Sequence, residues 1–108
     1  MTMLVNLTPH QITLVDDLGN IIQVVEPEAT SARCSSERQF AFEADSIRVN
    51  RTMFGEVSGL PDEVNGTWYI VSRIVAEASG RSDLIIPDET VRNAEGQIIG
   101  CKSFATLG

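Results

Sequence analysis

Five polar residues of this chain have side chains that could bind or activate a ligand. Thr8 and His10 flank Pro9 at a polar corner between two strand-like runs, and His10 is the only histidine. A histidine placed there could serve as a general base or orient a bound group. Arg81 lies two residues before Asp83, and Arg92 follows further along the chain. Arginine offers several donors in a fixed fork, which suits an anionic ligand.

Each of these groups also has a structural interpretation. Pro9 fixes its backbone angle, Thr8 can close a side-chain-to-backbone turn, and His10 can bond a backbone carbonyl. Arg81 and Asp83 can form an internal ion pair. Arg92 has the same two possibilities, a contact within the fold or a contact with a ligand. The residues therefore either bind a ligand or partner, or bind one another and stabilise the fold.

If a small-molecule site exists, we expect it where the Thr8–His10 corner approaches the loop from Gly80 to Asp83. Both segments border apolar strands, and a pocket needs apolar walls with a few convergent polar groups. Arg81 would supply charge there, while Thr8 and His10 would set the orientation of the ligand.

Recognised catalytic patterns are absent from the sequence. It contains no GxSxG, GxGxxG or GK[ST] motif, which argues against a serine hydrolase, a dinucleotide enzyme and a phosphate-loop enzyme. One histidine and two distant cysteines give no zinc constellation. We therefore expect no enzyme activity, no metal and no cofactor. Cys34 and Cys101 form no CxxC pair and are expected to be free thiols, with a disulfide as the alternative.

Charge and hydropathy narrow the choice of partners. The chain carries 15 acidic against 8 basic side chains, a net charge of −7. Such a balance repels phosphate backbones, so general nucleic-acid binding is not expected. No segment reads as a signal peptide or a membrane span, which predicts a cytoplasmic protein without membrane contact.

Hydrophobic alternation predicts many short strands. They are expected over residues 3–7, 12–18, 21–25, 47–57, 67–71, 84–86 (ending at Pro87), 90–93 and 97–104, with a bulge or bend at Gly55. The segments 19–22 and 96–99 share a glycine followed by β-branched residues, which predicts the same hairpin chemistry twice. Residues 28–46 are the least clear part of the chain: 32–35 could form a strand, and 36–45 are expected to form either an edge strand or a mobile loop.

One helix is expected at about 72–79, because apolar residues there follow helical spacing between Ser72 and Gly80. These elements predict a single domain over residues 1–108, of the β-rich α+β class. It would be an antiparallel sheet or a partly closed small barrel. The residues expected to be mostly buried are Ile12, Leu14, Ile22, Val24, Val49, Ile70, Ile74, Val75, Leu84, Ile98 and Phe104.

Exposed sheet edges and an apolar content of 43% predict a homo-oligomer. We expect the Phe40–Phe42 segment to be the contacting edge.

Several runs resemble those of a known family. They are V-N-L-T-P-H-x-I (5–12), G-E-V-x-G-L-P (55–61), G-T-x-Y-I-V-S (66–72), R-x-D-L (81–84) and the final G-Q-I-I-G (96–100). Together they are similar to small, mostly uncharacterised proteins encoded by bacteriophages, prophages and bacteria. The resemblance covers about half of the chain and fades between residues 26 and 50. It implies a phage-associated gene and transfers no catalytic residue.

Small size, an acidic surface and this phage association predict a non-catalytic accessory protein that neutralises a host component, as an anti-defence protein does. It would either block a host protein or sequester a small anionic nucleotide signal, with Thr8, His10, Arg81, Asp83 and Arg92 as binding residues. The alternative is a structural or decoration component of the phage particle.

Overall fold

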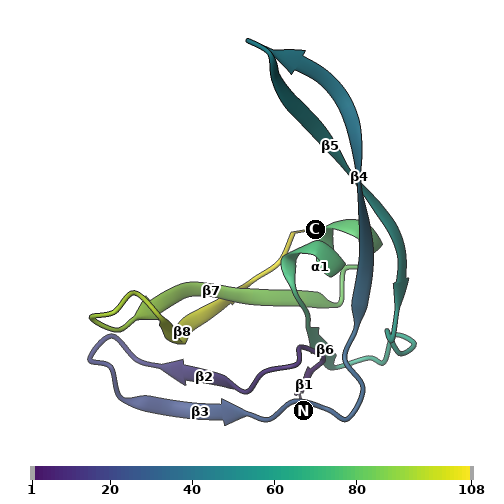
Figure 1. The fold of residues 1–108 in the computed structure, drawn as a ribbon. Coiled ribbons are helices and arrows are strands. Elements are labelled where there is room, and N and C mark those ends of the chain that lie inside the picture. The colour runs from purple at the N-terminus through teal and green to yellow at the C-terminus, as the bar shows by residue number, and fades with distance from the viewer. Residues whose placement is uncertain (1, 108) are drawn as a thin grey trace.

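A computed structural model describes residues 2–107 of the chain. Within them lie eight strands and one helix: β1 (Met3–Asn6), β2 (Ile12–Val15), β3 (Ile21–Val25), β4 (Arg33–Ala44), β5 (Ile47–Ser58), β6 (Thr67–Ile70), α1 (Arg73–Ser79), β7 (Leu84–Arg92) and β8 (Ile98–Ala105). The predicted β-rich class with one short helix is confirmed (Figure 1). β7 continues through Pro87 well beyond the predicted 84–86.

Six strands form one nearly closed, barrel-like sheet, which we call the body together with α1 and the connecting loops. The strand order is β1-β6-β7-β8-β2-β3, and a bridge from Asn6 to Pro27 brings the two edges together. The sheet is mixed, because β1 with β6, β6 with β7 and β2 with β8 run parallel. A parallel β6–β7 pair requires a crossover, and α1 supplies it.

Helix α1 begins and ends where the sequence predicted. The Ser72 hydroxyl accepts a hydrogen bond from the Val75 amide, and Gly80 closes the helix in a left-handed conformation. Its buried residues are Val75 and Ala76. The prediction of a buried Ile74 is wrong, since its side chain is 44% exposed. With only two turns, a small rotation of the helix exchanges which of its residues faces the sheet.

The core lies inside the body. One cluster surrounds Tyr69, Val71 and Leu84, and a second surrounds Ile70 and Cys101. Of the other predicted core residues, Ile12 and Val75 are buried, while Leu14, Val49 and Phe104 are half-buried. The predictions for Ile22, Val24 and Ile98 are wrong: these side chains are exposed. Alternation identifies one face of a strand, but no further layer covers that face here.

Strands β4 and β5 form a separate two-stranded sheet, which we call the arm (residues 33–58). Figure 1 shows it projecting from the body beside α1. The radius of gyration is 16.5 Å, against about 13 Å expected for a compact chain of this length. Of the two structures expected for residues 36–45, an edge strand or a mobile loop, the strand is present: β4 runs continuously over Arg33–Ala44. The predicted bulge near Gly55 is present, where the β4–β5 register shifts between Cys34 and Ser36.

The two ends of the arm meet at the body. Gly59, with φ +85°, approaches Ser31 so closely that a Cβ atom on Gly59 would lie 2.6 Å from the Ser31 carbonyl oxygen. Only glycine tolerates both that backbone angle and that contact. At the far end, Asp45 and Ser46 adopt positive φ angles of 51° and 64°, which suit a tight hairpin turn.

Candidate functional site

The polar corner after β1 is organised by Asn6, a residue the sequence interpretation did not single out. Asn6 is 1% exposed, and its amide nitrogen donates to the carbonyls of His10 (2.8 Å) and Val25 (3.1 Å). Its side-chain oxygen accepts from the Thr8 amide at 2.9 Å. The only sequence signal was a polar residue at the end of an apolar strand. Asn6 joins the corner to the end of β3 and so helps to close the barrel.

Thr8 closes the predicted local turn. Its hydroxyl lies 2.6 Å from the Asn6 side-chain oxygen and 3.0 Å from the His10 carbonyl, so its one proton can serve either acceptor. The backbone carbonyl of His10 thus accepts hydrogen bonds, whereas the prediction gave the bonding role to its imidazole. His10 itself is exposed. The corner is held by the side chains of Asn6 and Thr8 and by backbone groups, and the imidazole makes none of these hydrogen bonds.

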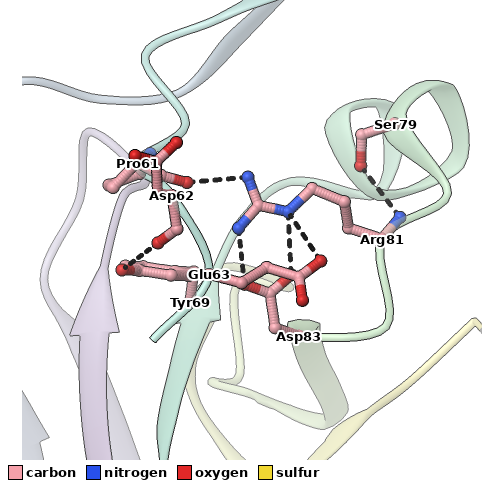
Figure 2. A network of polar contacts seen from close by, with 7 residues as sticks. All are labelled: Pro61, Asp62, Glu63, Tyr69, Ser79, Arg81 and Asp83. Carbon is pink, nitrogen blue, oxygen red and sulfur yellow. Dashed lines mark hydrogen bonds and ion pairs between the residues drawn. The ribbon is translucent and has the colours of Figure 1, made fainter. Parts of the chain in front are cut away.

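Arg81 lies at the centre of a second polar cluster (Figure 2). Its Nε and Nη2 atoms donate to the two carboxylate oxygens of Asp83, at 2.9 and 2.5 Å, and Nη1 donates to the Pro61 carbonyl at 2.7 Å. Glu63 lies 3.8 Å from Nε. The predicted internal ion pair between Arg81 and Asp83 is therefore confirmed.

Tyr69 lies against this cluster. The Arg81 guanidinium lies 5.9 Å from the centre of the Tyr69 ring, and the tyrosine hydroxyl donates to the Asp62 carbonyl at 3.1 Å. The hydrogen bonds to Asp83 raise the pKa of Arg81, against the opposing effect of burial. The arginine stays charged, and it fastens the loop before β6 to the start of β7.

Arg92 has a local structural contact. Its Nη1 atom donates to the Gly96 carbonyl at 2.8 Å, inside the turn between β7 and β8. Asn93 accepts the amides of Glu95 and Gln97 through its side-chain oxygen, each at 3.0 Å. Arg92 thus contributes to a hairpin turn.

The turn between β2 and β3 has the same design. One Asp16 carboxylate oxygen accepts the amides of Leu18 and Asn20, each at 2.9 Å. Gly19 and Gly96 have φ angles of 85° and 83° in the two turns. The prediction of one hairpin chemistry used twice is confirmed.

The structure does not bring the two predicted halves of a pocket together. Thr8 and His10 follow the C-terminal end of β1, whereas Arg81 and Asp83 precede the N-terminal end of β7. Since β1, β6 and β7 run parallel, the two clusters lie at opposite ends of these strands. Within residues 2–107, no hydrogen bond or ion pair joins them. The shared pocket predicted from the sequence is therefore wrong.

A cavity of about 520 Å³ adjoins the Arg81 cluster. It is lined by Glu63, Trp68, Ser82, Asp83 and the loop 64–67. Two of its lining side chains are carboxylates, and the nearby guanidinium already binds Asp83, Glu63 and the Pro61 carbonyl. This surface is poorly suited to an anion.

Both cysteines are free thiols, as predicted, with Cys101 buried and Cys34 only half-buried. Burial raises the pKa of the Cys101 thiol. Among the described residues, no helix is long and apolar enough to cross a bilayer. No family model, curated protein or solved structure matches this chain.

Proposed function

We propose that this protein is a non-catalytic, phage-associated accessory protein that binds and neutralises a host protein in the host cytoplasm. The division of charge supports this proposal. The arm contains four arginines and four acidic residues, so its net charge is zero, whereas the rest of the chain has four basic and eleven acidic residues. The whole net charge of −7 therefore lies outside the arm, and an acidic surface attracts a partner with a basic one.

Capture of a small anionic nucleotide is the less favoured mechanism. It would require Arg81 or Arg92 as an anion receptor. The donors of Arg81 are used by Asp83 and Pro61, and Arg92 binds a carbonyl of its own turn. An anion would have to displace these contacts within an acidic body. Blocking of a basic protein surface requires no such rearrangement.

Affinity capture from a bacterial lysate, followed by cross-linking mass spectrometry, tests the proposal. The captured protein should have a basic surface, its cross-links should map to the body, and its recovery should fall as salt is raised. The double variant Glu28→Lys/Glu95→Lys should lose capture. The matched arm variant Glu43→Lys/Glu56→Lys changes the total charge equally and should retain it. Equal loss in both variants would contradict a body-specific surface.

A thermal-shift screen separates the two mechanisms. Ligands that bind only the folded state raise the melting temperature. Cyclic nucleotides should leave the melting temperature unchanged if the partner is a protein. An increase of the melting temperature with nucleotide concentration would contradict blocking of a host protein and favour sequestration of a nucleotide.

A structural or decoration component of the phage particle is the second candidate. The long exposed arm favours it, because an extended hairpin can reach a neighbouring subunit. Mass spectrometry of purified particles would find the protein in many copies per particle if this function is correct. An accessory protein would be found in infected cells and not in particles.

A further inference from the structure

The outer part of the arm, residues 37–53, has no support from the body. Helix α1 packs beside the arm, and the arm residues partly buried against the core, Cys34 and Val57, lie at its base. Beyond them the two strands pair only with each other. An isolated two-stranded ribbon is marginally stable in water. The outer arm therefore lacks the packing that would stabilise it by itself, and a surface from another molecule could supply that packing.

One face of the arm's tip is apolar, whereas the same face nearer the base carries Gln39 with Arg51 and Glu37 with Met53. Cross-strand partners share a face, and the register pairs Phe42 with Val49 and Ala44 with Ile47. We call these four residues the apolar strip. Phe42 is 56% and Ile47 68% exposed. The intervening pair, Glu43 with Arg48, lies on the opposite face.

On the opposite face, one aromatic side chain has a contact within the arm. There the Arg48 guanidinium lies 5.7 Å from the centre of the Phe40 ring, a contact that partly covers an exposed aromatic side chain. No comparable contact covers Phe42 among the described residues. Phe40 is 59% and Phe42 56% exposed. The two rings are thus about equally exposed, and we take Phe42 as the contacting residue because it has no such contact with a cation.

The body contains a cavity that suits an aromatic ring. It measures about 140 Å³ and lies between β2 and β8, lined among others by Ile12, Pro87, Thr90 and Ile99. A mainly apolar cavity of about 150 Å³ is large enough to bind benzene. The register between β2 and β8 is a single pair, Leu14 with Cys101. Ile98 and Ile99 extend the apolar surface, at 56% and 54% exposure.

Charge and area both favour a second copy of this chain as the partner. A neutral arm can approach a body of charge −7, whereas two such bodies repel each other. A face of the outer arm measures about 27 by 10 Å, from eight residues in β4 (37–44) beside seven in β5 (47–53). Two reciprocal contacts would bury about 1,000 Å² in total, near the lower limit for a specific interface.

We propose that two copies exchange arms. The apolar strip of each arm packs on the body of the other copy, with Phe42 in the cavity between β2 and β8. The contact is isologous, since each copy gives an arm and receives one. This dimer does not depend on the proposed host partner, so either proposal can fail without the other.

Light scattering during size-exclusion chromatography of the full chain tests the exchange. The native protein should be a dimer at micromolar concentration. Phe42→Asp/Ile47→Asp should weaken dimerisation at least about 100-fold, because it places charge in an apolar contact. The control Asn50→Asp/Thr52→Asp adds the same charge on the opposite face and should remain dimeric. A monomeric native protein, or a dimeric strip variant, would overturn the proposal.

A mixing experiment identifies the receiving surface. The strip variant keeps the cavity but loses its arm contact, whereas Ile99→Lys keeps the arm and loses the cavity contact. Each should be monomeric alone, and their mixture should form a heterodimer through the one intact contact, detectable by native mass spectrometry. An Ile99→Lys variant that is dimeric by itself would mean that arms pair with each other, and would overturn docking on the body. Unchanged tryptophan fluorescence of both variants verifies that the body is folded.

Discussion

The body and the arm are stabilised in different ways. The body encloses Ile70 and Val71, which are fully buried, and Asn6, whose polar atoms all have partners within the fold. The arm is of similar β-strand character, yet Phe40, Phe42 and Ile47 are more than half exposed. Strand formation alone therefore does not show whether the side chains of a segment are covered within one copy of the chain. The core of the body is packed within one copy, whereas the outer arm pairs only with itself.

The largest expected difference concerns Asn6. Asn6→Ala should lower the free energy of unfolding by about 2–4 kcal/mol, because the Thr8 amide and the Val25 carbonyl lose their partner at a buried position. Asn50→Ala on the exposed arm should change it by less than about 0.5 kcal/mol. Urea denaturation followed by the single tryptophan, Trp68, measures both. Equal effects would remove the distinction between body and arm.

Arg81 tests whether the second polar cluster is structural. Arg81→Ala should cost about 1–3 kcal/mol, since Asp83 and the Pro61 carbonyl lose their donors in a partly buried setting. Arg92→Ala removes one exposed bond inside a turn and should cost less than about 1 kcal/mol. The same denaturation assay compares them. If Arg81→Ala leaves the free energy of unfolding unchanged, Arg81 has no structural role, and ligand binding becomes the better explanation of its position.

Amide hydrogen exchange sharpens the comparison without any mutation. If a second copy supports the outer arm, dilution by about a hundredfold should accelerate exchange in residues 37–53. Exchange in β1 and β6 should not change, because these strands pair within the same chain and lie outside the proposed contact. Concentration-independent exchange throughout would show that the arm needs no partner.

The smallest effect concerns acid. The backbone bond from Asn20 is the largest cause that lowers the pKa of Asp16 from its usual 3.8. This contribution to stability is therefore complete above pH 3.8 and is lost as the pH falls through the lower folded value. Asn93 forms the matching turn without a charge. NMR should detect acid-dependent shifts at the Leu18 and Asn20 amides that are larger than any shift at the amide of Gln97, which bonds the uncharged Asn93.

The sequence predicted elements better than their mutual placement. Ser72 and Gly80 bounded α1 because capping is local, and Gly19 and Gly96 marked their turns for the same reason. Residues 28–46 stayed ambiguous, because the exposed aromatic residues of β4 have no intramolecular face that would produce a clear alternation. Ile22 and Ile98 were misplaced because alternation does not show whether another layer exists.

The candidate site shows the same division. The pair Arg81–Asp83 was predictable from a separation of two residues, and so was the turn at Thr8. The role of Asn6 was not, because its acceptor on Val25 lies 19 positions away. The distance between the two clusters depends on β1, β6 and β7 being parallel, which local sequence does not specify.

The meeting of Ser31 and Gly59 makes the arm a module whose length can vary independently of the barrel. Two residues inserted in each strand would lengthen it by about 7 Å and keep the same side chains on each face. One residue in each would exchange the faces. In an arm-exchanged pair, insertions by twos would therefore adjust the spacing between the two acidic bodies while the barrel sequence stays the same.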